Sequence, residues 1–333
     1  MGTAIKKKTA ALLCAAILIF MSANAFAVGD RLVPVGKAVG ITLEIDGALV
    51  CAFREVETAR GRLSPAEESG VKPGDVITGI NGRRVSSAED LMSVLDDCAG
   101  AEMTATVVRH GVMTELDLKA ERNTDGCLEL GILVRDRISG IGTVTWYDPE
   151  TGEYGALGHS VSDPETGCAL PLRGGSVSPV EISSVRPGSG GKPGELVGLI
   201  KNDERTGDVT RNTACGIFGS VGANAYEGET LQTADSREIR TGKAELIATV
   251  DGASAERYEI EITKVYGRGS GRDMLVEVTD AHLIEKTGGI VQGMSGCPVI
   301  QNGKLIGAVT HVLVNEPTKG YAISIERMLA AAA

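Results

Sequence analysis

The chain of 333 residues contains one serine whose neighbours suit nucleophilic chemistry. Ser295 lies in the hexapeptide Gly293-Met294-Ser295-Gly296-Cys297-Pro298, which is followed by an apolar segment, an Asn302-Gly303 turn signal and a second apolar segment. Glycines beside a serine leave room for a substrate carbonyl and for backbone N–H donors. The pattern predicts acyl transfer to Ser295, with the N–H groups of Gly293 and Ser295 forming the oxyanion hole.

A serine nucleophile needs a base, and the chain has four histidines. His159, in Ala156-Leu157-Gly158-His159-Ser160, follows an expected strand and has small neighbours, which favours it as the base. His110 lies at an expected turn, and His282 lacks small neighbours. His311 lies on the strand expected after the nucleophile and could equally be a hydrogen-bonded core imidazole.

The base in turn needs a group that fixes its tautomer, and a carboxylate that accepts from the imidazole Nδ1–H does this. Asp280 closes an apolar strand that begins at Leu275, whereas its competitor Asp163 follows His159 by four residues and has the character of a turn acid. We therefore expect Asp280 to orient the base. The order His159, Asp280, Ser295 is that of the chymotrypsin arrangement and differs from subtilisin and the α/β-hydrolases.

These residues need a scaffold that brings them together. From Leu128 onward, short β-branched segments bounded by Gly, Asn, Asp and Pro recur, and no helix of four turns is evident before Met328. Only 3% of the residues are aromatic and 44 are glycine, which favours turn-rich antiparallel β structure. We expect a mainly β fold in which residues 126–333 form a chymotrypsin-like double β-barrel.

An earlier segment has the pattern of a binding module. Residues 64–85 contain a capped turn starting Ser64-Pro65, then an apolar strand and the hairpin signal Asn81-Gly82. The segment resembles a PDZ domain of the type attached to bacterial envelope proteases, over residues 32–120. The resemblance implies that the backbone of Val39-Gly40-Ile41 receives a peptide carboxylate, while the strand 42–45 pairs with the peptide. Alternatively, the protein's own chain fills this groove.

The N-terminal 27 residues have the pattern of an export signal. Three lysines at positions 6–8 precede an uncharged, mostly apolar segment from Ala10 to Met21, and Ala25-Phe26-Ala27 supplies a small-x-small cleavage pattern. The apolar segment is short for a membrane span. We expect export across the cytoplasmic membrane, with cleavage favoured over a permanent anchor and slow cleavage leaving a transient membrane tether.

Charge and cysteine spacing exclude several classes of function. A formal net charge of −11 argues against nucleic acid as a partner. The seven cysteines are widely spaced without a C-x-x-C pair, so neither a zinc site nor a disulfide framework is indicated and free, mostly buried thiols are expected. The glycines at 173–175 and 187–191 lack the strand and helix of a nucleotide-binding loop. We expect no metal and no cofactor.

Several stretches together resemble the SpoIVB peptidase family of endospore-forming bacteria. The longest covers 288–312 around Ser295 and continues into 315–321, and the others are 156–160, 192–195 and 212–219. With the export signal and the PDZ-like module, the resemblance covers nearly the whole chain. It implies that His159, Asp280 and Ser295 are the catalytic residues.

The resemblance also implies a biological role. It implies a secreted serine endopeptidase, made in the forespore, that acts in sporulation signalling in the space between the two sporulation membranes. Family members cleave a regulator of a membrane-embedded metalloprotease, which releases processing of a late mother-cell sigma factor, and they also cut themselves. One departure is Cys297, where the family usually has a second serine. Two alternatives stay open: a cysteine peptidase that uses Cys297 with His159 or His311 as base, and a catalytically silent PDZ scaffold.

Overall fold

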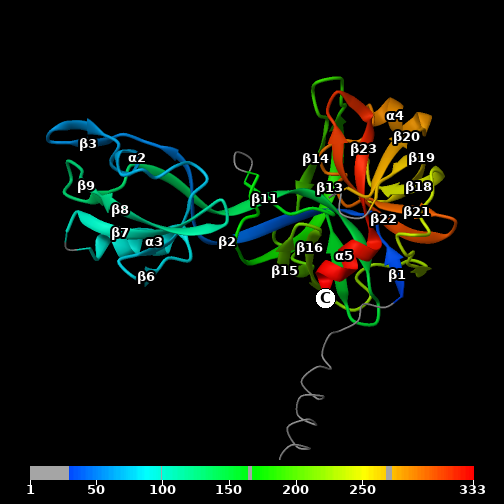
Figure 1. Cartoon of the computed structure of the whole chain (residues 1–333), viewed down its shortest axis with the longest axis horizontal. Coiled ribbons are helices and arrows are strands. Elements are labelled where there is room, and N and C mark those ends of the chain that lie inside the picture. The colour runs from blue at the N-terminus through cyan, green and yellow to red at the C-terminus, as the bar shows by residue number, and fades with distance from the viewer. Residues whose placement is uncertain (1–29, 99, 164–166, 268–271) are drawn as a thin grey trace, which may run out of the picture.

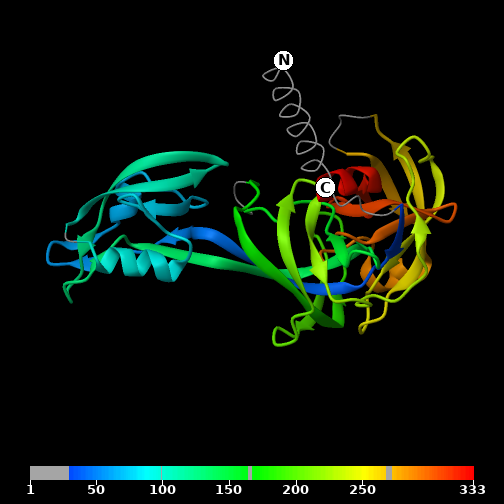
Figure 2. The same cartoon turned by 90° about the horizontal axis from the view of Figure 1, so that it is seen from below.

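Two long antiparallel strands define the architecture of the protein. The computed structural model describes residues 30–98, 100–163, 167–267 and 272–333. Strand β2 (Ala38–Phe53) leaves a body of two barrels and enters a smaller domain, and β11 (Ile132–Tyr147) returns beside it. Figures 1 and 2 show this pair as a stem between the two bodies.

Six strands form the first barrel. Their pairings run from β2 through β11, β12, β16, β15 and β13 back to β2, which closes the ring. The further bounds are β12 Glu153–Ala156, β13 Leu172–Arg186, β15 Gly207–Thr213 and β16 Gly216–Val221. Three strands extend this barrel: β14 (Glu195–Ile200) beside β13, β1 (Arg31–Pro34) beside β11, and β17 (Leu231–Gln232) beside β1.

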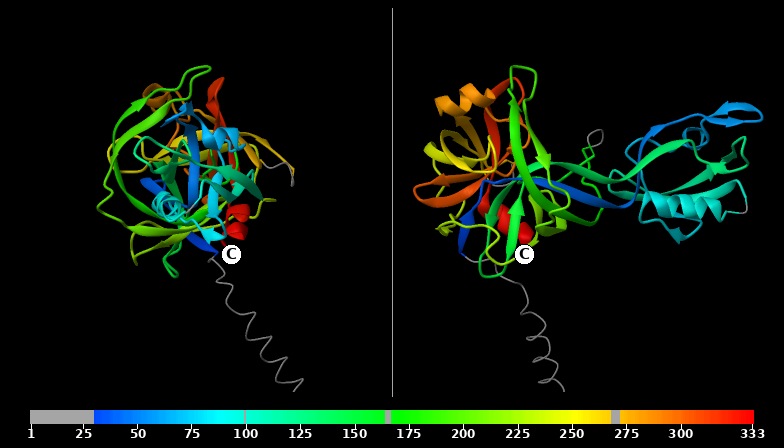
Figure 3. Two further views of the ribbon diagram at one scale, coloured as in Figure 1. Left: turned by 90° about the vertical axis from the view of Figure 1, so that its left-hand side faces the viewer. Right: turned by 180° about the vertical axis from the view of Figure 1, so that it is seen from behind.

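Six further strands close the second barrel, in the order β18, β19, β20, β23, β22, β21. Their bounds are β18 Gly242–Ala248, β19 Glu256–Val265, β20 Met274–Val278, β21 Pro298–Gln301, β22 Lys304–Leu313 and β23 Glu316–Ser324. Every second residue of β19 is buried from Tyr258 to Ile262, as expected for a strand with one face toward a core. Helix α4 (Ala281–Thr287) follows β20 and α5 (Ile325–Ala332) follows β23. Figure 3 shows the two barrels side by side.

The smaller domain consists of short strands and two helices. Its bounds are β3 Val56–Thr58, β4 Gly61–Leu63, α2 Pro65–Glu68, β5 Val76–Ile80, β6 Arg83–Arg84, α3 Ala88–Asp96, β7 Glu102–Arg109, β8 Val112–Lys119, β9 Glu121–Arg122 and β10 Leu128–Glu129. Helix α3 starts at Ser87, whose side chain accepts from the N–H of Asp90, and it buries Leu91, Val94 and Leu95. The predicted turn Asn81-Gly82 joins β5 to β6.

The smaller domain is inserted into the first barrel, which corrects the prediction that it begins at residue 32 and precedes the barrels. Residues 38–45 of β2 pair with β11 and β13, whereas Ala48 and Leu49 of the same strand pair with β5. One strand thus serves both the first barrel and the inserted domain, within one continuous sheet of 13 strands. Gly47 lies between the two parts with a φ of +135°, and a Cβ there would lie 2.7 Å from the carbonyl oxygen of Ile77.

A small apolar cluster packs the two bodies against each other at the end of the stem. It combines Ile45 and Leu49 of β2 with Val76 of the inserted domain and Leu170 of the first barrel. The predicted export signal, residues 1–27, lies outside the described residues. Within the described ranges, no helix has the length and apolar character that a membrane span requires.

Candidate active site

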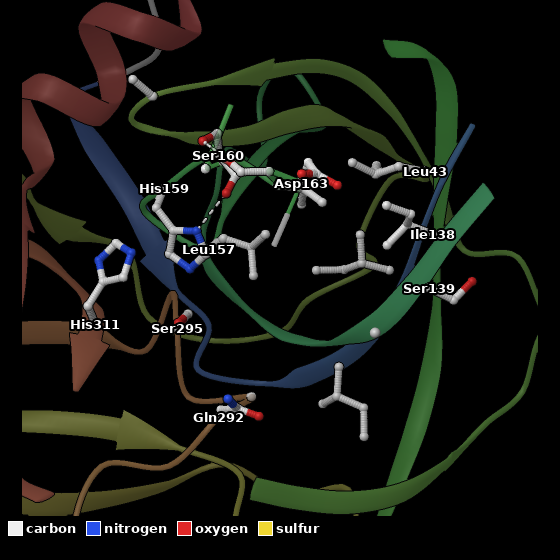
Figure 4. Close-up of a pocket in the computed structure, with 18 residues that line it drawn as sticks. Leu43, Ile138, Ser139, Leu157, His159, Ser160, Asp163, Gln292, Ser295 and His311 are labelled. Carbon is white, nitrogen blue, oxygen red and sulfur yellow. Dashed lines mark hydrogen bonds between the residues drawn. The ribbon is translucent and has the colours of Figure 1, made fainter. Parts of the chain in front are cut away.

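Ser295 and His159 both line a cavity of about 810 Å³ (Figure 4). Ser295 lies in the loop between α4 and β21 of the second barrel, and His159 follows β12 in the first. Apolar side chains of the first barrel line much of the cavity, among them Ile41 and Leu43. The predicted nucleophile and base thus line the same cavity, although 135 residues lie between them in the sequence.

Strand β11 holds the nucleophile loop through three hydrogen bonds. The Thr143 hydroxyl donates to the carbonyl of Gly293 at 2.8 Å, and the Thr143 N–H donates to the carbonyl of Ser295 at 3.0 Å. The Thr145 hydroxyl donates to the carbonyl of Gly296 at 2.7 Å. Both threonines are buried. The signal in the sequence for these two residues is a Thr-x-Thr pair within the fully buried end of β11, residues 142–147.

These bonds turn the carbonyl groups of the loop toward β11, away from the cavity. Among the described residues, no hydrogen-bond acceptor faces the N–H of Gly293 or of Ser295, so both donors are available to a ligand oxygen. Gly293 has a φ of +99°, a backbone conformation that residues other than glycine rarely adopt. The two N–H groups predicted to form the oxyanion hole are therefore available to a ligand, as that role requires.

The imidazole of His159 is held in the tautomer that a general base needs. Its Nδ1 lies 2.8 Å from the carbonyl oxygen of Ser160, and because a carbonyl can only accept, Nδ1 carries the proton. Nε2 is therefore the unprotonated nitrogen. Burial lowers the pKa of His159, since it disfavours the charged ring, and the bond to Ser160 opposes this in part. Leu157, two residues earlier, has a φ of +69°, a conformation that is uncommon outside glycine.

The hydroxyl of Ser295 points to a backbone group in this structure. Its Oγ donates to the carbonyl of Thr310 on β22 at 2.6 Å. Attack on a substrate requires the hydroxyl to turn from Thr310 toward His159, because the base must receive its proton. A rotation about one side-chain bond changes the direction of Oγ without moving the loop.

The structure does not bring Asp280 to His159, which corrects the prediction that it orients the base. Asp280 is the N-cap of α4: one carboxylate oxygen accepts from the N–H of Leu283 at 3.0 Å and the other from the N–H of Glu259 at 3.3 Å. These backbone donors, Leu283 first, lower the pKa of Asp280. Its competitor Asp163 does line the cavity.

His311 lies beside the predicted base, on β22. The ring centroids of His159 and His311 are 4.7 Å apart, with 37° between the ring planes. Burial lowers the pKa of His311, and the nearby His159 and Arg272 add to this effect. His311 therefore belongs to the site as a neighbour of the base, a position that the sequence left open.

The thiol of Cys297 is unsuited to be the nucleophile, which removes the cysteine peptidase alternative. The side chain is fully buried and contacts the hydroxyl of Thr143, with Sγ to Oγ1 at 3.6 Å. Burial raises the pKa of Cys297 to about 12, so the reactive thiolate is absent at neutral pH. The described residues contain no group of three His, Cys, Asp or Glu side chains arranged to hold a metal ion.

The predicted carboxylate-binding residues Val39, Gly40 and Ile41 lie inside the first barrel instead of in the inserted domain. They pair with β11 on one side and β13 on the other, so they cannot receive a peptide strand. The start of β11, in contrast, belongs to the inserted domain. Ile132 and Val134 pack against the core that contains α3, and the N–H of Ala88 donates to Asp136 at 3.1 Å.

Comparisons with known proteins agree with this organisation. Residues 126–329 match the family SpoIVB peptidase S55, and residues 59–109 match a PDZ domain. The match to the family covers more than half of the chain.

Curated relatives match over part of their own length. A probable periplasmic serine endoprotease DegP-like of Rhizobium meliloti is 29% identical over 53% of this chain and 32% of the relative. A putative zinc metalloprotease of Agrobacterium fabrum is 29% identical over 62% of this chain and 51% of the relative. The chain thus spans about a third and about half of their lengths.

Solved structures of a protease are also similar. The inactive form of Rv3671c from M. tuberculosis H37Rv shows 13% identity and a TM-score of 0.35, with 59% of this chain and 80% of that chain covered. The match over residues 126–329 covers most of the two barrels and includes both Ser295 and His159, which line one cavity. The chain belongs to the SpoIVB peptidase S55 family.

Proposed function

We propose that the protein is a serine endopeptidase that uses Ser295 as nucleophile and His159 as general base. His159 Nε2 takes the hydroxyl proton as Oγ attacks a peptide carbonyl, and the N–H groups of Gly293 and Ser295 bind the resulting oxyanion. The same proton then passes from His159 to the leaving amine, and the acyl-enzyme forms. Water, deprotonated by His159, hydrolyses this ester and restores Ser295.

The observation that carries the proposal is the hydrogen bond from His159 Nδ1–H to the carbonyl of Ser160. It fixes the tautomer whose Nε2 can accept a proton, in the cavity that also contains Ser295. In this site a backbone carbonyl does the work that a carboxylate does in the Ser-His-Asp triad. A carbonyl carries no full charge, so it stabilises the imidazolium less, and a modest turnover follows.

A peptide library tests the proposed activity. Peptides prepared from a bacterial proteome are incubated with the purified chain, and new termini are identified by mass spectrometry. Cleavage by the natural chain that disappears in Ser295→Ala and in His159→Gln supports the proposal. Cleavage that persists in Ser295→Ala contradicts it, and a folded natural chain that cuts nothing favours the silent PDZ scaffold.

The biological role that we propose follows from membership of the family. The protein is exported, possesses a cleaved or transiently tethered N-terminus, and acts between the forespore and mother-cell membranes. Its substrates are itself and a regulator of the membrane-embedded metalloprotease that processes a late mother-cell sigma factor. A sporulating strain that carries Ser295→Ala is expected to accumulate the unprocessed sigma factor.

We further propose that a peptide binds the inserted domain along the start of β11. Residues 132–135 pair with β2 on one edge, and no strand among the described residues pairs with their other edge, next to α3. A free edge beside a helix accepts a peptide by β-augmentation. Val134→Pro removes one ladder donor and is expected to weaken peptide binding in a fluorescence titration, whereas Leu133→Ala, which changes an exposed side chain, is not.

A further inference from the structure

The cavity that contains Ser295 and His159 has an apolar part, which the first barrel supplies. Its side chains are those of Ile41, Leu43, Ile138, Leu157 and Val161. Figure 4 shows Leu43 and Ile138 on the side of the cavity opposite to His159 and Ser295. Lys and Arg side chains are missing from the lining within the described ranges, and its carboxylate is the buried Asp163. The volume of about 810 Å³ is typical of pockets that enclose most of a ligand.

Gly140 of β11 leaves this apolar part of the cavity unfilled. Gly140 pairs directly with Ile41, so the two residues lie on one face of the sheet. Ile138, two residues earlier, lies on the same face. At Gly142, two residues later, that face is already filled, because a Cβ there would lie 2.6 Å from Cδ1 of Ile41. A Cβ at Gly140 would have no heavy atom within 4 Å, so the space for a side chain exists and Gly140 does not fill it.

The edge of β11 nearest to Ser295 is suited to bind an extended peptide. The N–H of Thr143 donates to the carbonyl of Ser295 and not to β2. Because backbone groups alternate between the two edges of a strand, those of Ile141 and Ser139 point to the same edge as Thr143. Among the described strands, none pairs with β11 on this edge beside Ile141 and Ser139. A peptide can therefore add to this edge by β-augmentation, directly next to Ser295.

The direction of that peptide follows from strand pairing. Strand β11 runs from Ser139 toward Thr143, and Thr143 contacts the residue that carries the nucleophile. Antiparallel pairing is the more stable kind, so a bound peptide runs from the cut bond at Ser295 toward Ser139. The part of the peptide on this edge is thus C-terminal to the cut bond. Its residue opposite Gly140 directs its side chain to the face that bears Ile41.

We propose that Gly140 opens a specificity subsite for a large apolar side chain, Leu, Ile, Met or Phe, a few residues C-terminal to the cleaved bond. Ile41, Ile138 and Leu157 contact this side chain, and its burial among them favours binding. An Asp or Glu side chain would lose its hydration there and find no Lys or Arg among the described lining residues. The inference rests on the proposed peptidase activity and deepens it, because it names the class of substrate.

The peptide library tests the subsite in the natural chain. Large apolar residues are expected to be enriched at one fixed position on the C-terminal side of the cut bond. A cut peptide is then synthesised again with Ala, Lys or Glu at that position. Each new form is expected to be cut about tenfold more slowly, because less apolar surface is buried. Equal cutting of all forms, or enrichment of charged residues at that position, would overturn the proposal.

Filling the space beside Gly140 supplies the matched variants. The φ of Gly140 is not positive, so its backbone accepts a side chain. Gly140→Leu is expected to reverse the preference, so that the peptide with Ala is cut faster than the peptide with a large apolar residue. Gly174→Leu is the control and should keep the natural preference. Gly174 lies on β13, pairs with Glu44, has equal space for a Cβ and does not line the cavity.

The preference is a ratio of two cutting rates within one variant, so it does not depend on the fraction of folded protein. An unchanged ratio in Gly140→Leu would contradict the subsite and leave the peptidase activity in place. If Gly140→Leu does not fold, Gly140→Ala, which adds one methyl group, is expected to weaken the preference in the same direction, and an unchanged ratio there counts equally against the subsite. Absence of any cutting by the folded natural chain contradicts the peptidase activity and the subsite with it.

Discussion

At the scale of single residues, the site depends on two side chains and one backbone carbonyl. Ser295 and His159 share a cavity, and the carbonyl of Ser160 sets the tautomer of the ring. Asp280, which the sequence favours as the third member of a triad, is occupied by the N-terminus of α4. Substitution of Ser295 or His159 should therefore affect catalysis, whereas substitution of Asp280 should affect stability, and the two effects can be measured independently.

Substitution of Asp280 is expected to affect stability more than catalysis. Asp280→Ala removes the cap of α4 and should lower the free energy of unfolding by about 1 kcal/mol in urea titrations. Asp280→Asn keeps a good cap and should leave stability nearly unchanged. Both variants should retain kcat/KM within a few-fold. A loss of about 10⁴ in kcat for Asp280→Asn would instead identify this residue as a member of the triad.

The pH dependence of activity should reflect the buried base. The unperturbed pKa of histidine is about 6.5, and burial lowers the pKa of His159. The neutral, basic form of the ring therefore persists to lower pH than usual. The acid limb of a plot of kcat/KM against pH is expected to have its midpoint below about 6.5. A midpoint above that value would show that a carboxylate, and not the carbonyl of Ser160, faces the ring in the working enzyme.

Replacement of Cys297 by serine should be mild. The Sγ of Cys297 is buried beside Thr143, and a serine hydroxyl can use the same partner. Cys297→Ser is expected to retain most of kcat/KM, and iodoacetamide should leave the natural enzyme active while the protein is folded. Rapid inactivation by iodoacetamide, absent in Cys297→Ser, would mean that the thiol takes part in the reaction.

At the scale of elements, β11 links the inserted domain to the nucleophile loop. Its first residues pair within the inserted domain, and its Thr143 and Thr145 hold the carbonyls of Gly293 and Gly296. The loop that carries Ser295 is thus shaped by a strand of the other barrel. A substitution on β11 can alter the oxyanion hole without touching a substrate.

Thr143→Val tests this link, because valine has the shape of threonine without the hydroxyl. The carbonyl of Gly293 loses its donor, which should cost about 1–3 kcal/mol in stability, and kcat should fall because Gly293 N–H is no longer held in place. Thr263→Val serves as the control, since its hydroxyl donates to Leu275 on an exposed face. Equal kcat values for the two variants would contradict the role of Thr143.

The sequence predicted the strands and the turn Asn81-Gly82, because those features depend on local patterns, and the predicted Ser295 and His159 line one cavity. It could not predict that residues 38–53 are shared between the first barrel and the inserted domain, since apolar residues recur along the whole strand and mark no boundary between its two parts. The role of Asp280 could not be predicted, because an acid after a strand can either face a base or cap a helix. The glycines at 288–289, which follow the last residue of α4, are the signal in the sequence for a short helix that begins at Asp280.

At the scale of the whole molecule, the inserted domain is an addition to a closed barrel. Glu44 pairs with Arg137 and Leu43 with Ile138, so β2 and β11 are regularly paired at the barrel end of the stem. A variant in which Asn-Gly replaces residues 45–136 is expected to fold and to cut peptides, because the turn closes the hairpin. Circular dichroism and the peptide library check this. Loss of all cutting in a folded variant would show that the inserted domain completes the active site.

The central claim is that Ser295 is a nucleophile activated by His159 without Asp280. The most direct measurement is fluorophosphonate labelling of the folded chain, followed by mass spectrometry of the modified peptide. We expect the label on Ser295 in the natural chain and in Asp280→Asn, little label in His159→Gln, and none in Ser295→Ala. Label on another residue of the natural chain, or loss of label in Asp280→Asn, would contradict the account.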